Sequence, residues 1–271
     1  MPATTPTWDP GQYLRHAEHR ARPFAELLDR VPVLPGDPAR IADLGCGPGN
    51  VTVQLAGRWP GAHITGYDNS PQMLAGTGAY AGPTAGGGQL DFAHADLTDW
   101  TPTQTYDLIV SNAALQWVPG HLDAFPGWLD ALAPGGTFAF QVPNNIDAPL
   151  HALMRELAAS ARWQDRLAGV LRREDSVHAP LVYLDRLARL GCEVDVWETT
   201  YLQLLGGEDA VLDWSKGTGM RPVLTALADD PEAADAFTAE YRDLLRTAYP
   251  AAPYGTVLPF RRLFAVARKA A

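Results

Sequence analysis

The feature that most constrains this chain is a glycine-rich stretch, DLGCGPGN, at residues 43–50. Apolar residues lead into it, and residues 50–59 (NVTVQLAGRW) have the composition of a helix, so the glycines mark a strand-to-helix corner. Glycines at such a corner let the backbone turn sharply and let a ligand contact the main chain. They are Gly45, Gly47 and Gly49. This G-x-G-x-G spacing differs from the dinucleotide fingerprint G-x-G-x-x-G, so it disfavours a pyrophosphate ligand.

A second strand with an acid at its end follows the corner. Residues 63–68 (HITGYD) form this strand and end in Asp68, nineteen residues after Gly49. In a doubly wound sheet, an acid at the tip of the second strand faces the ribose of a bound nucleoside and accepts protons from both hydroxyls. Asp68 is therefore a candidate ribose ligand. Its alternative role is the N-cap of a helix that begins at Pro71, a role that Ser70 can also fill.

Two further strands bring polar residues to the same edge. Residues 90–97 (LDFAHADL) form a third strand, after which Asp96 and Leu97 lie either beside an adenine ring or in a plain strand-ending turn. Residues 106–110 (YDLIV) form a fourth strand that leads to Asn112. Ligands of open parallel sheets bind outside the carboxyl ends of the strands, so Asn112 is expected in the same crevice as the glycine corner.

The rest of the chain alternates between helical and extended patterns. Helices are expected over 71–80, 122–132, most of 150–190 and most of 208–249, and strands over 137–142, 193–202 and 262–268, with a tight turn at 134–136. A further helix is expected from Asp9 or Pro10 to about Arg30, interrupted or kinked at Pro23. A helix before the first strand can close over a cofactor, which makes Tyr13 and Arg20 candidate site residues.

The sequence predicts an α/β fold with helical insertions. The expected parts are an N-terminal helical lid (1–30), a nucleoside-binding core (31–145), a helical cap segment (146–190), a core strand (191–205), a helical cap and substrate segment (206–257) and a C-terminal core strand (258–271).

Charge and composition narrow the partners. The formal net charge is −10 with no long Lys/Arg block, which disfavours nucleic acid and acidic membrane surfaces as partners. The two cysteines, Cys46 and Cys192, make neither a disulfide framework nor a metal site, and no apolar run reaches membrane length. The residues near the N-terminus do not have the pattern of an export signal, so a cytoplasmic protein is expected. An anionic small molecule would have to be held by local cations.

Seven segments together resemble the trans-aconitate 2-methyltransferases. They are DLGCGPGN (43–50), GYDNSPQML (66–74), SNAALQWVPGH (111–121), WDPGQYLRHAEHRARP near the N-terminus, GCEVDVWETTY (191–201), DWSKGTGMRP (213–222) and LPFRRLFAVAR (258–268). The resemblance runs over nearly the whole chain, and the later segments are more specific than the glycine motif.

The resemblance implies a seven-stranded Rossmann-like sheet with a reversed last strand, as in class I methyltransferases. It also implies S-adenosylmethionine as cofactor and methyl transfer to a carboxylate of a small polycarboxylic acid, giving a monomethyl ester and S-adenosylhomocysteine. The residues implied at the cofactor are Asp43, Gly45, Gly47, Gly49, Asp68, Asn69, Met73, Asp96, Leu97 and Asn112, with Arg20 as a further candidate.

The implied reaction needs no catalytic side chain and no metal. A carboxylate has a reference pKa of about 4, so it is already ionised near pH 7 and needs no general base. Arginines would orient a tricarboxylate through paired hydrogen bonds. The candidates for substrate contact are Arg221 first, then Arg262 and Arg261, with Trp117, Tyr183 and Tyr13 as further candidates and His178 as the weakest.

Three alternatives remain open at this point. The acceptor could be a hydroxyl, amine or carbon of another small-molecule acid or secondary metabolite, and a hydroxyl acceptor would call for a base such as histidine. The protein could bind S-adenosylmethionine without turnover. A nicotinamide dehydrogenase is disfavoured by the glycine spacing.

Overall fold

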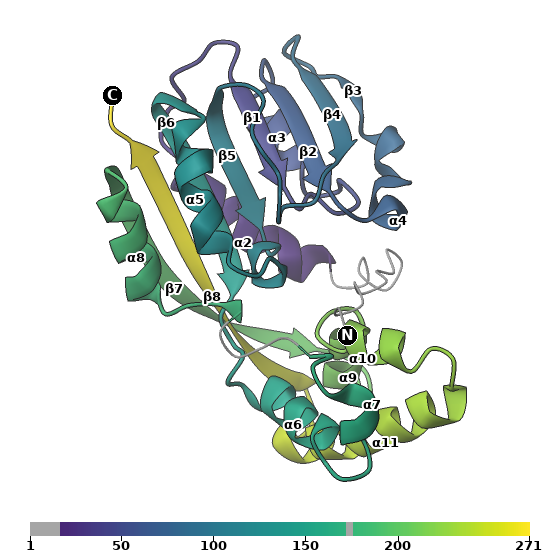
Figure 1. Ribbon diagram of the computed structural model, residues 1–271. Coiled ribbons are helices and arrows are strands. Elements are labelled where there is room, and N and C mark those ends of the chain that lie inside the picture. Colours follow the sequence, from purple (N-terminus) through teal and green to yellow (C-terminus); the bar gives the residue numbers. More distant parts are fainter. Residues whose placement is uncertain (1–16, 172–175) are drawn as a thin grey trace. The chain divides into compact units, whose positions relative to one another are not determined.

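The computed structural model describes residues 17–171 and 176–271. In this part of the chain the strands form one eight-stranded sheet in the order β3-β4-β2-β1-β5-β6-β8-β7 (Figure 1). The strands are β1 (Arg40–Leu44), β2 (His63–Asp68), β3 (Gly82–Pro83), β4 (Gln89–His94), β5 (Tyr106–Asn112), β6 (Leu132–Pro143), β7 (Cys192–Leu205) and β8 (Thr256–Lys269).

The pairing of the strands is that of a methyltransferase sheet. The central pairs β4–β2, β2–β1, β1–β5 and β5–β6 are all parallel, and β8 runs antiparallel to β6. The expected α/β fold with a reversed last strand is therefore confirmed, and the two-residue β3 is an addition at the edge of the sheet. Because the central strands are parallel, their carboxyl ends meet along one edge.

The described helices connect these strands and fill the two insertions. The α-helices are α2 (Ala17–Asp29), α3 (Val53–Arg58), α4 (Pro71–Leu74), α5 (His121–Asp130), α6 (Pro149–Ala158), α7 (Gln164–Leu167), α8 (Pro180–Arg189), α9 (Ala210–Lys216), α10 (Arg221–Ala226) and α11 (Pro231–Ala248), and the 3-10 turns are η1 (Thr77–Ala79) and η2 (Leu115–Trp117).

The chain divides into two compact units. The sheet unit comprises residues 18–143, 176–199 and 262–271, and the helical unit comprises residues 144–171 and 200–261 of the described chain. The boundaries fall inside β7 and β8, so each of these strands begins in one unit and ends in the other. Helix α8 lies within the segment expected as a helical cap (146–190), but it belongs to the sheet unit.

The core of the sheet unit lies between the sheet and helices α5 and α8. Phe125 and Trp128 of α5 and Tyr183 of α8 are almost fully buried there, against Phe138 and Phe140 of β6. Their rings pack edge to face or tilted, with Phe125 and Phe138 centroids 5.0 Å apart. This packing holds β5 and β6 rigidly, and with them the residues at their ends.

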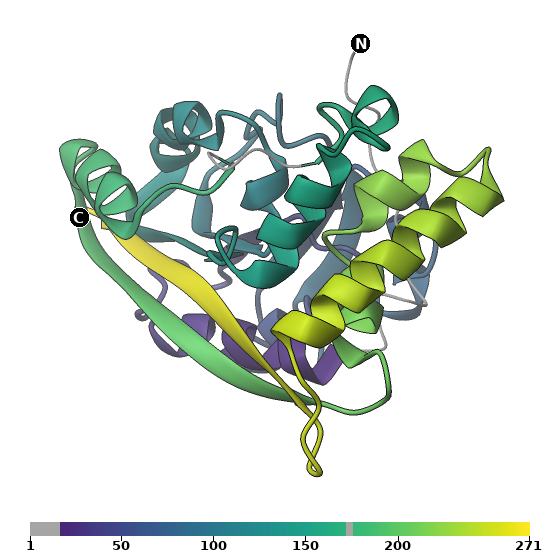
Figure 2. The same cartoon turned by 90° about the horizontal axis from the view of Figure 1, so that it is seen from below.

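The helical unit is built around α6 and α11, which lie side by side (Figure 2). Tyr241 of α11 is fully buried and donates its hydroxyl proton to Leu150 O at 2.6 Å, while Leu150 N donates to the Tyr249 hydroxyl at 3.1 Å. Both backbone groups lie at the start of α6, where the N–H has no partner within the helix. One tyrosine within α11 and one directly after it therefore fix the start of α6.

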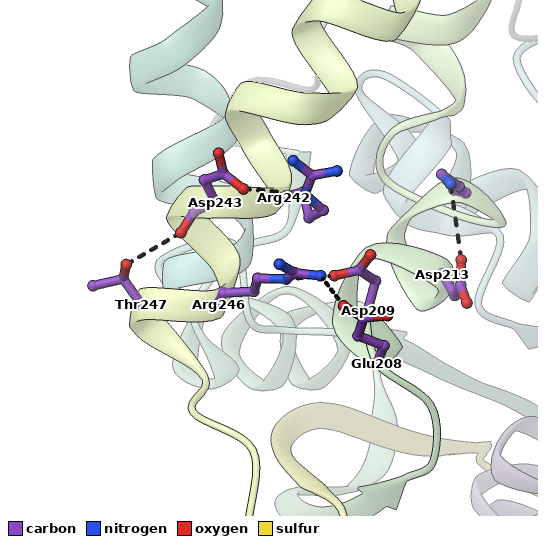
Figure 3. A network of polar contacts seen from close by, with 8 residues as sticks. Glu208, Asp209, Asp213, Arg242, Asp243, Arg246 and Thr247 are labelled. Carbon is purple, nitrogen blue, oxygen red and sulfur yellow. Dashed lines mark hydrogen bonds and ion pairs between the residues drawn. The ribbon is translucent and has the colours of Figure 1, made fainter.

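Ion pairs on the outside of the helical unit join its helices. Arg246 of α11 binds Asp209 Oδ1 through Nε at 2.8 Å and Glu208 Oε1 through Nη2 at 2.7 Å (Figure 3). Asp209 immediately precedes α9, so this contact links the two helices. Arg166 bridges to Asp230 at 2.9 Å in the same way, at the start of α11.

Several element boundaries differ from the expected ones. Helix α3 begins at Val53 rather than at residue 50, because the glycine corner continues as turns to Thr52. Helix α4 ends at Leu74, before the helix-weakening Gly76, and a separate 3-10 turn follows. The expected turn at 134–136 lies inside β6 as an irregularity in the pairing with β5.

Two further observations complete the fold. The start expected for the first helix, at Asp9 or Pro10, lies outside the described residues. The described helix α2 runs from Ala17 to Asp29 with Pro23 in its interior. Over residues 17–171 and 176–271, every helix is too short or too polar to cross a membrane.

Candidate functional site

The glycine corner is tied to the end of β2. Gly45 N and Cys46 N both donate to Tyr67 O, at 2.8 and 3.0 Å. Gly45 has a φ of 78°, and a Cβ there would lie 2.2 Å from the Ala114 side chain, so only glycine fits. Gly47 also has a positive φ, of 58°, but open space lies where its Cβ would be. The backbone at Gly47 therefore has room beside it for a ligand.

Asp68 is held in place by backbone groups on both sides of it. Its Oδ2 accepts a hydrogen bond from Gly47 N at 2.8 Å, and its Oδ1 accepts one from Ser70 N at 2.9 Å. Ser70 itself caps α4, since its hydroxyl accepts from Met73 N. Burial raises the pKa of Asp68, and the two N–H donors lower it in part. Asp68 therefore joins the glycine corner to the end of β2.

Asp43 is the last residue but one of β1, and one of its carboxylate oxygens has no hydrogen-bond partner among the described residues. The residue is only 3% exposed, and its Oδ2 accepts from the Thr52 hydroxyl at 2.7 Å. No described residue hydrogen-bonds to its Oδ1. Burial raises the pKa of Asp43 to about 7, with a further rise from the charge of Asp68 and an opposing effect of the Thr52 bond. A buried acceptor of this kind calls for a donor or a cation.

The residues after β4 form a turn, and the carboxylate of Asp96 is hydrogen-bonded within it. Asp96 Oδ1 accepts from the backbone N and the hydroxyl of Thr98, at 2.9 and 2.8 Å, and these bonds lower the pKa of Asp96. Asn69 Nδ2 donates to Asp96 Oδ2 at 3.3 Å. Leu97 is buried, as is Met73 of α4. This geometry is compatible with both roles expected for Asp96, as a residue of a strand-ending turn and as a neighbour of a bound ligand.

Asn112 at the end of β5 belongs to a chain of three polar side chains. Gln141 of β6 stands directly opposite Asn112 in the register of the two strands and donates from Nε2 to Asn112 Oδ1. Arg262 of β8, 2% exposed, donates from Nη1 to Gln141 Oε1 at 3.0 Å. Arg262 was expected from the sequence at the substrate, whereas Gln141 was not expected, because its place depends on strand register.

The backbone turns sharply just after Asn112. Ala113 has a φ of 57°, a left-handed conformation that costs a non-glycine residue about 1–2 kcal/mol. It is held by Ala113 N donating to Gln141 O at 2.9 Å and by Gln116 Nε2 donating to Ala113 O at 2.6 Å. Strain fixed by its surroundings is typical of functional sites, and here it accompanies a residue already expected there.

The remaining candidates are dispersed. In the sheet unit, Trp117 ends η2 and is half-buried, whereas Tyr183 lies in the core with its hydroxyl 2.9 Å from His121 Nε2. In the helical unit, Arg221 begins α10, and Arg261 binds Asn144 O at 2.6 Å and Asp147 Oδ1 at 2.9 Å. The described residues include neither Tyr13 nor the side chain of Arg20.

His178 and His121 lie beside Tyr183. His178 N donates to the Tyr183 hydroxyl at 3.2 Å, and burial raises the pKa of Tyr183 to about 12 and lowers that of His121. His121 is almost fully buried in the same core. The geometry therefore gives these three residues mutual contacts inside the protein.

The residues at the strand ends suit a nucleoside that also has a positively charged group. The corner offers open backbone at Gly47, β2 offers the carboxylate of Asp68, and Asp43 offers a buried oxygen without a described donor. Together with the parallel sheet and the reversed β8, this arrangement defines a class I methyltransferase.

Comparison with known proteins agrees. A family model described as a methyltransferase domain matches residues 41–136. A trans-aconitate 2-methyltransferase from Streptomyces avermitilis is 70% identical over 271 residues, 100% of each chain. One from Streptomyces coelicolor is 69% identical over 99% of this chain and 89% of its own. The chain therefore belongs to the trans-aconitate 2-methyltransferase family, and the resemblance found in the sequence is confirmed.

A solved structure supports the fold independently. An S-adenosylmethionine-dependent methyltransferase from Mesorhizobium loti aligns over 93% of this chain and 99% of its own, with a TM-score of 0.50 and 23% identity. At that identity the likeness concerns the fold alone, which is the fold expected from the sequence.

Proposed function

We propose that this protein transfers a methyl group from S-adenosylmethionine to a carboxylate of trans-aconitate, giving a monomethyl ester and S-adenosylhomocysteine. The observation that carries the proposal is the 70% identity over the whole length to a trans-aconitate 2-methyltransferase. The strand-end geometry supports it, because the carboxylates and open backbone suit a nucleoside cofactor without phosphates.

Each strand end has a role in holding the cofactor. Asp68 binds the two ribose hydroxyls, and its position is fixed by Gly47 N and Ser70 N. Asp43 Oδ1, which has no described donor, receives the cofactor's ammonium group. The other cofactor contacts proposed from the resemblance are Gly45, Gly47, Gly49, Asn69, Met73, Asp96, Leu97 and Asn112, with Arg20 as a further candidate.

The chain supplies position rather than acid or base catalysis. The cofactor, when bound, provides an electrophilic methyl group on a sulfonium. The acceptor carboxylate is ionised at neutral pH, so no side chain has to remove a proton. What the protein must do is hold the oxygen in line with the methyl carbon and exclude water, and such orientation can supply about 7–11 kcal/mol of the barrier.

The acid is held by arginines. We propose Arg221 as the main ligand of its carboxylates, because a guanidinium pairs with a carboxylate through two parallel bonds. Arg262, which is 2% exposed and donates to Gln141 Oε1, would act on the ligands only through Gln141. Arg261 is a weaker ligand in this proposal, since it binds the carboxylate of Asp147. Trp117, half-buried just after β5, would cover the reacting groups, and Tyr13 remains a proposed substrate contact. Tyr183 is not proposed as one, because it is fully buried in the core with its hydroxyl beside His121.

The test uses methyl-labelled S-adenosylmethionine and a panel of acids. Trans-aconitate should give a base-labile labelled ester, and its cis isomer, a saturated tricarboxylate, a hydroxy acid and an aromatic acid should react much more slowly. Labelling of a hydroxyl or amine acceptor instead would show a different acceptor class. Tight cofactor binding without turnover on any acid would show a binding protein rather than an enzyme.

A further inference from the structure

The hydrogen bonds that link Arg262, Gln141 and Asn112 can have only one order of donors and acceptors. A guanidinium donates hydrogen bonds and accepts none, so the Gln141 group that faces Arg262 must be its oxygen. The Gln141 amide nitrogen then faces Asn112, and the Asn112 group that faces it must be the oxygen. The observed bonds, Arg262 Nη1 to Gln141 Oε1 and Gln141 Nε2 to Asn112 Oδ1, follow this order.

The consequence is a donor at the end of β5. With its oxygen bound to Gln141, Asn112 can offer only Nδ2 elsewhere, and no described residue accepts a hydrogen bond from it. Asn112 is half-buried, whereas Gln141 is completely buried and Arg262 nearly so. The two inner members are therefore fixed within the sheet unit, and the outer member is the one that a ligand can reach.

We propose that Gln141 is a positioning residue that holds the Asn112 amide with its N–H groups toward a carboxylate of the bound ligands. The inference rests on the proposed function, which places the carboxylates of the cofactor and of the acid at this edge of the sheet. The positive charge of Arg262 polarises Gln141, and Gln141 in turn makes Asn112 a better donor. The site thereby favours an anionic group over one that donates hydrogen bonds.

The rigidity of the three strands supports this role. Asn112 and Gln141 are paired in register, and Arg262 lies diagonally opposite Gln141, whose direct partner on β8 is Phe264. Ala113 N is bound to Gln141 O, so the backbone beyond Asn112 is anchored to the same residue. Gln141 thus controls both the amide of Asn112 and the turn that follows it.

The decisive variant is Gln141→Glu, which should reverse the orientation of the Asn112 side-chain amide. Its two oxygens can accept from Arg262 and from Asn112 Nδ2, so the Asn112 oxygen would turn toward the ligand carboxylate. We expect kcat/KM for the acid to fall about 10- to 100-fold, the range of one lost charge-assisted hydrogen bond. Gln141→Met, which keeps the size but fixes neither orientation, should lose about 2- to 5-fold. Gln164→Glu on exposed helix α7 is the charge-matched control and should match the wild type.

A double-variant cycle separates positioning from simple charge repulsion. In an Asn112→Ala background there is no amide to turn, so adding Gln141→Glu should cost less than about 3-fold in kcat/KM. An undiminished loss in that background would overturn the proposal, and so would wild-type kinetics in both Gln141→Met and Gln141→Glu. If Gln141→Glu fails to fold, the Gln141→Met result decides, with wild-type kinetics again overturning it.

Two binding measurements identify the carboxylate. If Asn112 faces the methionine part of the cofactor, Gln141→Glu should raise the Kd of S-adenosylhomocysteine by calorimetry, and kcat/KM for the acid should fall through kcat with KM for the acid unchanged. If it faces the acceptor, KM for the acid should rise and that Kd should stay the same. Either pattern supports the positioning role. A wild-type protein that binds no cofactor would refute the proposed function itself, whereas a cofactor-binding enzyme indifferent to Gln141 would refute only this inference.

Discussion

Two carboxylates of the sheet unit, Asp43 and Asp68, are placed differently from the ion pairs on the surface of the helical unit. At the strand ends of the sheet unit, Asp43 is buried with an oxygen that no described residue binds, and Asp68 is held by backbone N–H groups. In the helical unit, Arg246 lies 45% exposed in side-chain area and pairs with two carboxylates. Buried carboxylates cost stability, whereas exposed ion pairs change it little. The comparison indicates that Asp43 and Asp68 are placed to bind a ligand, whereas Arg246 makes surface pairs that change stability little.

The largest effect should come from replacing Asp43. Because the folded protein raises its pKa from 3.8 to about 7, the folded state binds more protons than the unfolded state between these values, and stability falls as the pH rises. The loss amounts to about 3 kcal/mol between pH 4 and pH 7. Asp43→Asn should lack this decline in urea unfolding measured across that range. Asp99→Asn, at an exposed position, controls for the loss of one charge, and parallel pH curves for Asp43→Asn and wild type would contradict the assignment.

The release of protons on cofactor binding should also identify Asp43. If the cofactor's ammonium lies against Asp43, the pKa of Asp43 falls on binding and about half a proton is released at pH 7. Calorimetry in buffers with different ionisation enthalpies measures this release directly. Asp43→Asn should bind the cofactor more weakly and release none, and a release as large as in the wild type would point to another group.

The next effect is on ribose binding. Asp68→Asn keeps the size of the side chain but removes its charge and one acceptor, so the Kd for S-adenosylhomocysteine should rise about 100-fold. Calorimetry with the folded variant, checked by circular dichroism, measures it. Asp91→Asn, an exposed change in neighbouring β4, is the matched control. Unchanged affinity in Asp68→Asn would leave the carboxylate with only its role at the glycine corner.

Replacing Arg221 should have a smaller effect, which falls on the affinity for the acid and spares the affinity for the cofactor. Arg221→Ala should raise KM for the acid about 10- to 100-fold while the Kd of S-adenosylhomocysteine stays within a factor of two, because a guanidinium pairs with carboxylates of the acid. Steady-state kinetics and calorimetry on the same preparation give both numbers. An equal loss of both affinities would show that Arg221 supports the structure of the helical unit instead.

The smallest effect is expected outside any site. Arg246→Ala removes both exposed ion pairs of Figure 3 and should leave kcat, KM and cofactor affinity unchanged, with little shift in the urea midpoint. A large loss of activity would show that the contrast between the two units does not hold.

The sheet unit could be predicted closely because its signals are local. Strand β2 has the expected bounds, and β1 ends where the glycine corner begins, since glycines and an acid mark where these strands end. The site residues at these strand ends could be predicted because parallel strands bring their carboxyl ends together. The expected helix over 71–80 was wrong in its second half, where Gly76 and Gly78 replace helix with a tighter turn.

What could not be predicted depends on long-range register. Gln141 contacts Arg262, 121 positions away, only because β6 and β8 pair in one particular alignment. No local pattern distinguishes Gln141 from any polar residue in an apolar strand. The helical insertion also gave only a general expectation of helices, since the pairing of α6 with α11 rests on tyrosine hydroxyls from a distant segment.

The division of β7 and β8 between the two units has a consequence for how such a protein can change. Removing the helical unit would cut both strands in mid-course, after Thr199 and before Arg262, and would leave two broken ends in a hydrogen-bonded sheet. Exchanging the helical unit for another would therefore require both strands to be joined again in register at these two points.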